Sequence, residues 1–185
     1  MSYSGLADFI LALERNGELH RIKTFVDPLL EITEVTDRIT KAGGKALLFE
    51  NNGTEFPLLI NAFGSDKRIS MALGKNDLSE AGNDIEEIYN LITDAPAGFF
   101  DKFLALPRFY KIAGYLPEQT RAKGICQQIV SSRPDLSTLP VLKCWPHDGG
   151  RFVTLPMVHT VHPLTGKPNV GMYRMHSPTL KNDAL

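Results

Sequence analysis

The spacing of apolar residues changes along this chain, and the change limits the folds that it can adopt. Up to residue 93, stretches with a helical repeat alternate with short strand-like runs. From Ile125 onward the apolar residues form only strand-like runs, separated by clusters of Pro, Gly and Asp. The sequence therefore predicts an α+β protein, in which an α/β region is followed by a β-rich region.

The α/β region is expected to follow the order α-β-α-β-β. Apolar residues from Leu6 to Leu13 recur at the helical spacing, and Gly17 follows them as a stop signal. A tight hairpin is predicted at Asn52-Gly53, because Asn and Gly readily adopt positive φ angles. The remaining expected elements are a strand over 18–26, a helix carrying Ile32, Val35 and Ile39 that ends at Gly43-Gly44, and strands over 45–50 and 56–63.

Two more helices are expected after these strands, over Asp66–Gly74 and over Asp84–Thr93, the second with Asn83 and Asp84 as its cap. Residues 94–117 are rich in Pro, Gly and aromatic residues and lose clear periodicity. Such a stretch predicts a crossing between domains. We therefore expect an α/β domain over 1–113 and a β-rich domain over 114–176.

Strands of the β-rich domain are expected over 125–130, 141–145, 152–161 and 169–175. The last two flank a Pro- and Gly-containing loop over 162–168 and are expected to form an antiparallel pair. In the tail over 177–185 the apolar pattern stops, with no signal that covers a strand edge. The β-rich domain is therefore expected to be truncated.

The composition is that of a globular protein and excludes several classes. Hydrophobic residues make up 43% and charged residues 22%, which is enough to bury a core. A net charge of −1 without a basic stripe argues against a nucleic-acid partner. No apolar run approaches the ~20 residues of a membrane helix, and no signal peptide is apparent. Cys126 and Cys144 lack CxxC spacing, so we expect reduced thiols and a cytoplasmic location.

Asn169 and Arg174 are the polar residues of interest in the last expected strand. They are five positions apart, so a regular strand would direct them to opposite faces. One ligand could meet both only if the strand wraps or bulges, and Gly171 between them permits a close backbone approach. On spacing alone, an ordinary hairpin strand with a solvated arginine is the better interpretation.

A series of short motifs resembles the UbiD family, the decarboxylases that use prenylated flavin mononucleotide. The family pattern of a Trp-Pro-x-Asp-Gly-Gly segment, a Thr-Leu-Pro turn and an Asn-Val-Gly-x-Tyr-Arg strand is similar to residues 145–150, 154–156 and 169–174. Segments 31–38 and 57–74 resemble the N-terminal domain of the family. The resemblance covers nearly all of the chain from Leu6 to His176, in order.

The resemblance implies a reversible, nonoxidative decarboxylation of an aromatic or α,β-unsaturated carboxylic acid, such as a polyprenyl-4-hydroxybenzoate of quinone biosynthesis. It implies prenylated FMN as the cofactor, held through Mn²⁺ with K⁺ nearby. Asn169 would be a metal ligand, Met172 and Tyr173 would lie along the flavin, and Arg174 would be both a flavin contact and a catalytic residue. The β-rich domain would contain the first strands of a split β-barrel of the flavin reductase type.

The family also uses a His ligand, a Glu ligand and an acidic proton donor, and all three follow the arginine by more residues than are present here. The 185-residue chain alone is therefore expected to be inactive, and whether it is itself an enzyme stays open. The alternative hypothesis is a noncatalytic remnant of the family that serves oligomerisation or pairing with a partner. A homo-oligomer is the expected assembly of the intact family, with a small carboxylic acid as substrate.

Other polar and aromatic groups have simpler interpretations. Glu31 and Glu34 are better explained by a solvated helix face, near Arg38 and Lys41, than by a pair of catalytic carboxylates. The aromatic residues over 99–110 predict packing at the domain crossing rather than a substrate groove. The histidines are expected to be strand, turn or loop residues rather than metal ligands: His147, His159, His162 and His176.

Overall fold

A computed structural model describes residues 3–93, 110, 114 and 122–177. The described residues form two compact units, one within 70–133 and the other within 2–69 and 134–185. The larger unit therefore combines segments that are far apart in the sequence. The architecture is mixed α and β, as the spacing of apolar residues predicts.

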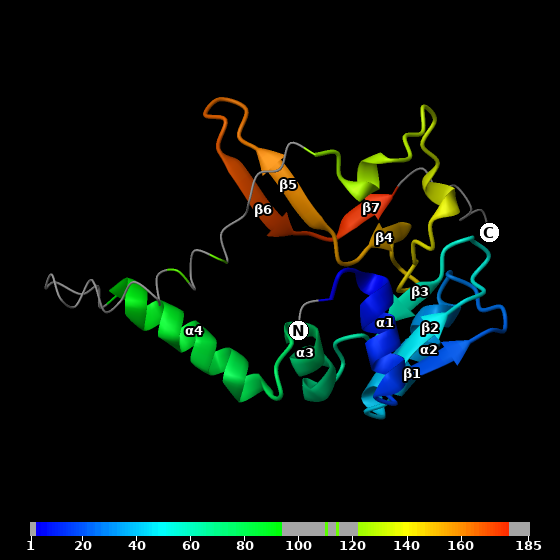
Figure 1. Cartoon of the computed structure of the whole chain (residues 1–185). Helices are drawn as coiled ribbons and strands as arrows, with labels where there is room; N and C mark the ends of the chain where they lie inside the picture. Colours follow the sequence, from blue (N-terminus) through cyan, green and yellow to red (C-terminus); the bar gives the residue numbers. More distant parts are fainter. Residues whose placement is uncertain (1–2, 94–109, 111–113, 115–121, 178–185) are drawn as a thin grey trace, which may run out of the picture. The chain divides into compact units, whose positions relative to one another are not determined.

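A three-stranded sheet forms the centre of the larger unit (Figure 1). Strand β2 (Ala46–Phe49) lies between β1 (Leu19–Ile22), which is parallel to it, and β3 (Leu58–Ile60), which is antiparallel. A parallel pair needs a crossover connection, and helix α2 (Glu31–Lys41) provides it. With α1 (Leu6–Arg15) before β1, the predicted order α-β-α-β-β is confirmed.

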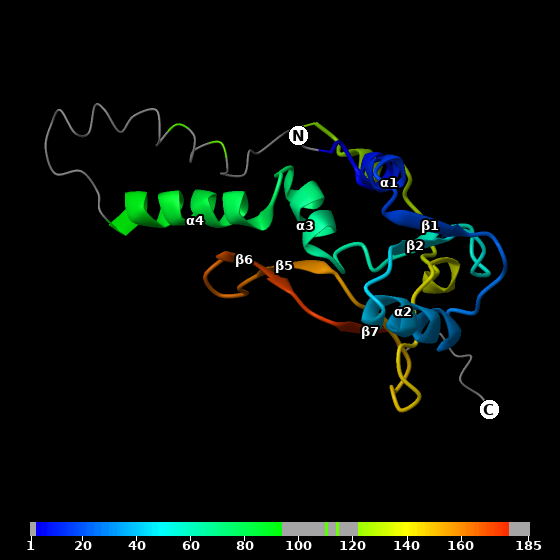
Figure 2. The same cartoon turned by 90° about the horizontal axis from the view of Figure 1, so that it is seen from below.

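The core of this unit lies around β2. All four residues of β2 are buried, which requires cover on both faces of the sheet. Figure 2 shows α1 and α2 on opposite faces. Ile32 of α2 packs with Leu47 and Phe49, and Leu142 joins the same cluster from the later part of the sequence. The β-rich segment thus contributes to the core of the α/β sheet.

Both helices of this unit end where the glycines predict. Gly17 has a φ of 69° and Gly43 a φ of 66°, a region that costs other residues free energy. The amide of Gly17 donates to the carbonyl of Glu14, and that of Gly43 to the carbonyl of Thr40. These contacts satisfy carbonyls in the last turn of each helix.

The predicted tight hairpin at Asn52-Gly53 is wrong in detail. Strands β2 and β3 are antiparallel, but a longer loop joins them, and only Gly53 has a positive φ, of 82°. The side chain of Asn52 is buried and organises this loop. Its amide nitrogen donates to the carbonyl of Phe56 at 2.9 Å, while its oxygen accepts from the hydroxyl of Thr54 at 2.8 Å.

Helix α3 (Asp66–Leu73) matches the expected bounds, whereas α4 (Leu78–Thr93) begins earlier than the predicted Asp84. Asp77 provides its cap, because Oδ1 accepts from the backbone nitrogen of Glu80 at 3.1 Å. The side chain of Glu80 reaches the residue before the cap, where its Oε2 accepts from the backbone nitrogen of Asn76 at 3.1 Å. The N-cap is therefore Asp77, so Asn83 and Asp84 lie inside the helix instead of capping it.

Strands of the β-rich segment are shorter than predicted and form two antiparallel pairs. β4 (Arg151–Val153) pairs with β7 (Met175–Ser177), and β5 (Met157–Val161) pairs with β6 (Pro168–Met172), the pair expected from the sequence. The single strand expected over 152–161 is divided at residues 154–156, where Pro156 cannot donate to a ladder. The described strands do not close into a barrel.

Two other expected strands are absent from the described part of the chain. Residues 125–130 contain a 3₁₀ turn at Ile125–Gln127, and the apolar side chains of Ile125, Ile129 and Val130 are exposed, since no strand pairs with them there. Over 141–145 only isolated bridges form, between Leu142 and Phe152 and between Leu29 and Lys143. The domain limit at residue 113, most of the aromatic cluster over 99–110 and nearly all of the tail over 177–185 lie outside the described residues.

Candidate functional site

The β5–β6 hairpin has two chemically different faces, because side chains alternate along each strand. The pairs Met157–Met172, His159–Val170 and Val161–Pro168 lie on one face, which is exposed and, apart from His159, apolar. The pairs Thr160–Asn169 and Val158–Gly171 lie on the other face, which is partly polar. Asn169 and Met172, both predicted site residues, are therefore on opposite faces of the hairpin.

Asn169 presents an exposed amide on the polar face. Across the ladder it faces Thr160, and its side chain makes no hydrogen bond to another residue in the described ranges. A carboxamide oxygen is a neutral, hard donor that suits Mg²⁺, Ca²⁺ or Mn²⁺. Asn169 is thus free to contribute one oxygen ligand.

Gly171 allows the ring of Tyr173 to lie against the strand. A Cβ built on Gly171 would be 2.5 Å from a ring carbon of Tyr173, so a larger residue would have to push the ring aside. Beyond Met172 the chain leaves β6, and the strict alternation of faces ends there. Arg174 lies in the link between β6 and β7, outside the regular strand. Asn169 and Arg174 therefore need not face opposite sides, as they would on one regular strand.

Arg174 is held at both the edge and the face of its guanidinium group. Its Nη2 donates to Asp148 Oδ1 at 2.8 Å, and its Cζ lies 3.8 Å from the centroid of the Phe152 ring. The same ring stacks on His176 with the centroids 4.8 Å apart. His176 Nε2 lies 3.3 Å from the carbonyl oxygen of Gly149, which fits the expected strand histidine.

Asp148 belongs to the turn that follows Trp145. Its Oδ2 accepts from the backbone nitrogen of Trp145 at 3.1 Å, and its own backbone nitrogen donates to the carbonyl of Trp145 at 3.1 Å. Partial burial alone would raise the pKa of Asp148, but the hydrogen bond and charge of Arg174 and the bond from Trp145 outweigh it, so the pKa is lowered. Asp148 therefore stays a carboxylate at neutral pH.

Cys144 lies close to this pair. Burial raises the pKa of its thiol; the charge of Asp148 raises that pKa further, while Arg174 acts in the opposite direction. A raised pKa keeps the group protonated and a poor nucleophile. Cys144 and Cys126 are both free thiols, which agrees with the sequence prediction.

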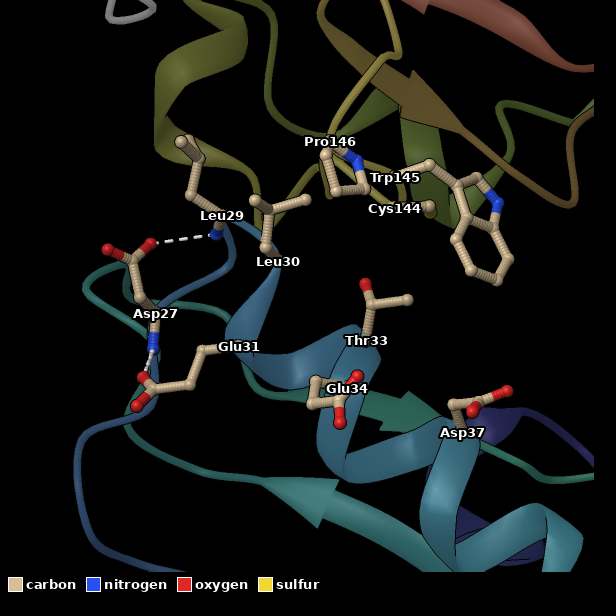
Figure 3. Close-up of a pocket in the computed structure, with 10 residues that line it drawn as sticks. All are labelled: Asp27, Leu29, Leu30, Glu31, Thr33, Glu34, Asp37, Cys144, Trp145 and Pro146. Atoms are coloured by element: carbon tan, nitrogen blue, oxygen red, sulfur yellow. Dashed lines mark hydrogen bonds between the residues drawn. The ribbon is translucent and has the colours of Figure 1, made fainter. Parts of the chain in front are cut away.

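A cavity of about 760 Å³ opens beside Cys144, still within the larger unit (Figure 3). It lies between the start of α2 and the segment Cys144-Trp145-Pro146. The other residues that line it are Asp27, Leu29, Leu30, Glu31, Thr33, Glu34 and Asp37. Its wall is thus partly acidic and partly apolar.

The carboxylates of this cavity already have partners. Asp27 Oδ1 accepts from the backbone nitrogen of Leu29 at 2.7 Å, and Glu31 Oε2 from the backbone nitrogen of Asp27 at 2.8 Å (Figure 3). Glu34 pairs with Arg38 and Asp37 with Lys41, each one helical turn apart. The interpretation of these acids as a solvated helix face is therefore preferable to a catalytic pair.

The backbone before α2 is strained at the edge of the cavity. Leu30 has a φ of 67° and a ψ of −33°, and the backbone nitrogen of Glu31 donates to the carbonyl of Leu29 at 2.8 Å. This is a γ-turn of the rare kind with positive φ. The backbone nitrogen of Leu30 also donates to the carbonyl of Lys143, which helps to hold the turn in place. Nothing in the sequence indicates this turn.

The remaining histidines match the simple interpretations. His162 Nδ1 accepts from the backbone nitrogens of Leu164 and Thr165, each at 3.2 Å, as a turn residue does. His159 lies on the exposed face of β5, and His147 is exposed in the turn after Trp145. In the part of the chain that the structure describes, no three His, Cys, Asp or Glu residues come together as metal ligands would.

Sequence reasoning missed the two residues that fix Arg174. Asp148 stands within the Trp-Pro-x-Asp-Gly-Gly motif, so its position was a usable signal, but its partner was not apparent. Phe152 looks like an ordinary strand residue. Only the antiparallel pairing of β4 with β7 brings it beneath Arg174.

Two family profiles match this chain. The 3-octaprenyl-4-hydroxybenzoate carboxy-lyase N-terminal domain matches residues 10–89, and the Rift-related domain of the same carboxy-lyases matches residues 118–181. A protein of Aquifex aeolicus is 44% identical over 176 residues, covering 94% of this chain and 36% of that protein. A protein of Archaeoglobus fulgidus is 43% identical over 176 residues, covering 95% and 35%.

Solved structures agree on the fold. The closed form of vanillic acid decarboxylase from Sedimentibacter hydroxybenzoicus has a TM-score of 0.68 at 23% identity, covering 94% of this chain and 35% of that one. An evolved dimeric form of the UbiD-class enzyme HmfF from Pelotomaculum thermopropionicum, in complex with prFMN, has a TM-score of 0.65 at 19% identity, covering 94% and 36%.

These matches identify the class as the 3-octaprenyl-4-hydroxybenzoate carboxy-lyases named in the two profiles. The chain belongs to the UbiD family. It spans about a third of the length of the relatives that it matches. Among its described helices, none is both long and apolar enough to cross a membrane.

Proposed function

We propose that this chain supplies the N-terminal domain and part of the flavin site of a UbiD-type decarboxylase. The reaction is the reversible, nonoxidative decarboxylation of an aromatic or α,β-unsaturated carboxylic acid, with a polyprenyl-4-hydroxybenzoate as one candidate substrate. The observation that carries the proposal is the ordered guanidinium of Arg174, in a motif typical of the family and beside a strand that presents Asn169.

Prenylated FMN fits the residues at the end of β6 and directly after it. Gly171 and Tyr173 form a closely packed wall, and the exposed guanidinium of Arg174 offers further donors to an anion. Met172 stands next to them, although on the apolar face of the hairpin. In this proposal Met172, Tyr173 and Arg174 line the flavin. When bound, the cofactor supplies the electron sink for breaking the bond to the carboxyl carbon.

For Mn²⁺ the fit is partial. The free amide of Asn169 suits a hard cation, but the described residues include no cluster of His, Cys, Asp and Glu that could complete its coordination. We therefore propose Asn169 as one ligand, with the His and Glu ligands of the family supplied by residues beyond Arg174. We propose in the same way that residues beyond Arg174 complete the K⁺ site. Because the reaction needs these ligands, we expect no turnover from these 185 residues alone.

The role of Arg174 follows from its chemistry. A planar guanidinium can bind a carboxylate through two parallel hydrogen bonds, which fixes the acid in one orientation. Asp148 takes up one Nη2 hydrogen bond, and about half of the Arg174 side chain stays exposed to solvent. Arg174 can therefore bind the substrate carboxylate and hold it in the orientation in which the carboxyl group is lost.

The architecture and assembly complete the proposal. We infer that the β4–β7 and β5–β6 pairs are strands of a split β-barrel, and that an α/β domain extends to residue 113. A cytoplasmic homo-oligomer is proposed, and the existence of an evolved dimeric form of the UbiD-class enzyme HmfF supports an oligomer. The alternative is a noncatalytic module that retains the fold for oligomerisation.

Carbon dioxide release distinguishes these possibilities. The protein made from the whole coding sequence would be reconstituted with prenylated FMN and Mn²⁺ and supplied with a panel of aromatic and acrylic acids. Turnover above a heat-inactivated control supports the decarboxylase. A protein that binds the cofactor but releases no carbon dioxide from any acid would favour the noncatalytic alternative.

A further inference from the structure

We infer that Asp148 is a positioning residue for Arg174. Asp148 holds the edge of the guanidinium group, while the ring of Phe152 supports its face. The inference rests on the proposed function of Arg174, and it adds two residues to which that function gives no role. Neither residue needs to touch the substrate. Their effect is to limit the orientations that Arg174 can adopt before an acid binds.

The edge contact is rigid because Asp148 is itself fixed. Its side chain is only 12% exposed, whereas that of Arg174 is 47% exposed. One carboxylate oxygen accepts from the backbone of Trp145 and the other accepts from Arg174, so both oxygens are engaged. The position of the turn is thus transmitted to the guanidinium through a charge-assisted hydrogen bond.

The face contact is rigid for a different reason. Phe152 lies in β4, its backbone nitrogen donates to the carbonyl of Leu142 at 2.8 Å, and its ring also stacks on His176. Leu142 is part of the buried core. The ring beneath Arg174 is therefore anchored to the α/β sheet, and a cation over an aromatic face gains further stabilisation.

These two contacts leave a defined part of the guanidinium for a ligand. An arginine has five N–H donors, and Asp148 occupies one Nη2 donor. A free arginine side chain would lose considerable rotamer entropy on binding a carboxylate. Since Arg174 is already ordered, that cost is reduced when the acid arrives, which is the general advantage of a preorganised site.

A surface ion pair without functional effect is the competing explanation, because exposed pairs commonly contribute little. The pair Glu34–Arg38 is of that kind, since it joins two exposed residues within one helix. The pair Asp148–Arg174 instead joins residues 26 positions apart and has one partly buried member. An experiment on the reaction separates the two explanations.

The test compares Asp148→Asn with Asp148→Glu and Asp135→Asn in the reconstituted holoenzyme. Asp135 is the matched control, because its carboxylate also accepts a backbone hydrogen bond, from Ser137, but it has no arginine partner in the described residues. We expect Asp148→Asn to lower kcat per bound flavin about tenfold or more, as loss of a supporting group commonly does. Cofactor content should stay near wild type, Asp148→Glu should regain part of the rate, and Asp135→Asn should match wild type.

An unchanged kcat per bound flavin in Asp148→Asn, or a rate that falls only in proportion to lost flavin, would overturn the inference. A second readout requires neither turnover nor a stable Asp148 variant. In the cofactor-free protein, ¹³C NMR follows the titration of the Asp148 carboxyl group in wild type and in Arg174→Gln. The pKa of Asp148 should rise in the variant, and an identical titration would also overturn the inference.

The two readouts separate this inference from the proposed function. If the wild-type holoenzyme releases no carbon dioxide, the proposed function fails, and the inference that depends on it fails as well. The titration would then still show whether Asp148 and Arg174 are in contact. If wild type is active and the Asp148 variants are as active as wild type, only the positioning role is excluded.

Discussion

Arg174 is the residue on which the proposed chemistry depends most. Because it would bind the reacting carboxylate, Arg174→Ala should lower turnover by a factor of about 100 or more while leaving much of the flavin bound. Arg174→Lys should restore little, since a point charge cannot form the planar two-bond contact. The measurement is rate per bound flavin, with Arg38→Ala as a control, because among the described residues the Arg38 side chain pairs with Glu34 of the same helix.

Replacing Asn169 should weaken metal binding rather than lower the rate per bound flavin. If its amide oxygen is a ligand, Asn169→Ala should weaken the retention of flavin that depends on Mn²⁺, as losses around metal sites commonly do by about 10–100-fold. Flavin absorbance after dialysis against increasing concentrations of a chelator measures this. Asn90→Ala, in the exposed part of α4, is the control. Equal flavin retention in Asn169→Ala and wild type would favour the ordinary hairpin strand.

At the scale of elements, the loop before α3 depends on Gly64. A Cβ on Gly64 would be 1.8 Å from Oδ1 of Asn61, whose amide nitrogen bonds the carbonyls of Gly44 and Lys45. Gly64→Ala should therefore lower the free energy of unfolding by about 1–3 kcal/mol. Gly82→Ala in α4 meets nothing within 4 Å and should raise it by about 0.5–1 kcal/mol. Urea unfolding of both variants checks the opposite signs.

An ion-pair cluster connects α3 to the start of β1 and gives stability a pH dependence. Glu18 binds Lys67 at 2.7 Å and the buried Arg68 at 3.0 Å, and Arg68 also donates to the carbonyl of Gly44. The hydrogen bond from Lys67, followed by that from Arg68, lowers the pKa of Glu18 in spite of its burial. This contribution is present above the unfolded pKa of about 4.3 and is lost as pH falls through the lower folded value.

The predicted outcome is a fall in the urea midpoint between neutral pH and about pH 3, and a smaller fall in Glu18→Gln. Glu31→Gln is the control, because within the described ranges the Glu31 side chain accepts a backbone hydrogen bond from Asp27 and has no cationic partner. If Glu18→Gln and wild type lose stability in parallel with pH, the cluster makes no such contribution.

Local patterns predicted the elements that local interactions determine. Helices α1 and α2, which stop shortly before Gly17 and Gly43, were predictable because apolar spacing and a following glycine are both encoded nearby. The start of α4 was misplaced because its cap, Asp77, precedes the apolar stripe from which the helix was identified. The strand expected over 125–130 failed because a strand needs a partner, and apolar composition alone does not supply one.

At the scale of the whole molecule, the candidate site was predictable only in part. The motif over 169–174 identified Asn169 and Arg174, but their geometry depends on where β6 ends and on the pairing of β4 with β7. That pairing brings Phe152 to Arg174, and the turn after Trp145 brings Asp148. Contacts between distant segments have no signature in a single sequence, so the partners of Arg174 required the structure.

The most direct test of the account is anomalous diffraction from manganese in crystals of the holoenzyme with prenylated FMN. The account predicts an anomalous peak within about 2.0–2.6 Å of the Asn169 amide oxygen, the usual range for oxygen ligands of divalent cations. It also predicts the flavin along Met172, Tyr173 and Arg174, with Arg174 still bonded to Asp148. A manganese peak and a flavin elsewhere in the protein, with Asn169 and Arg174 facing solvent, would contradict it.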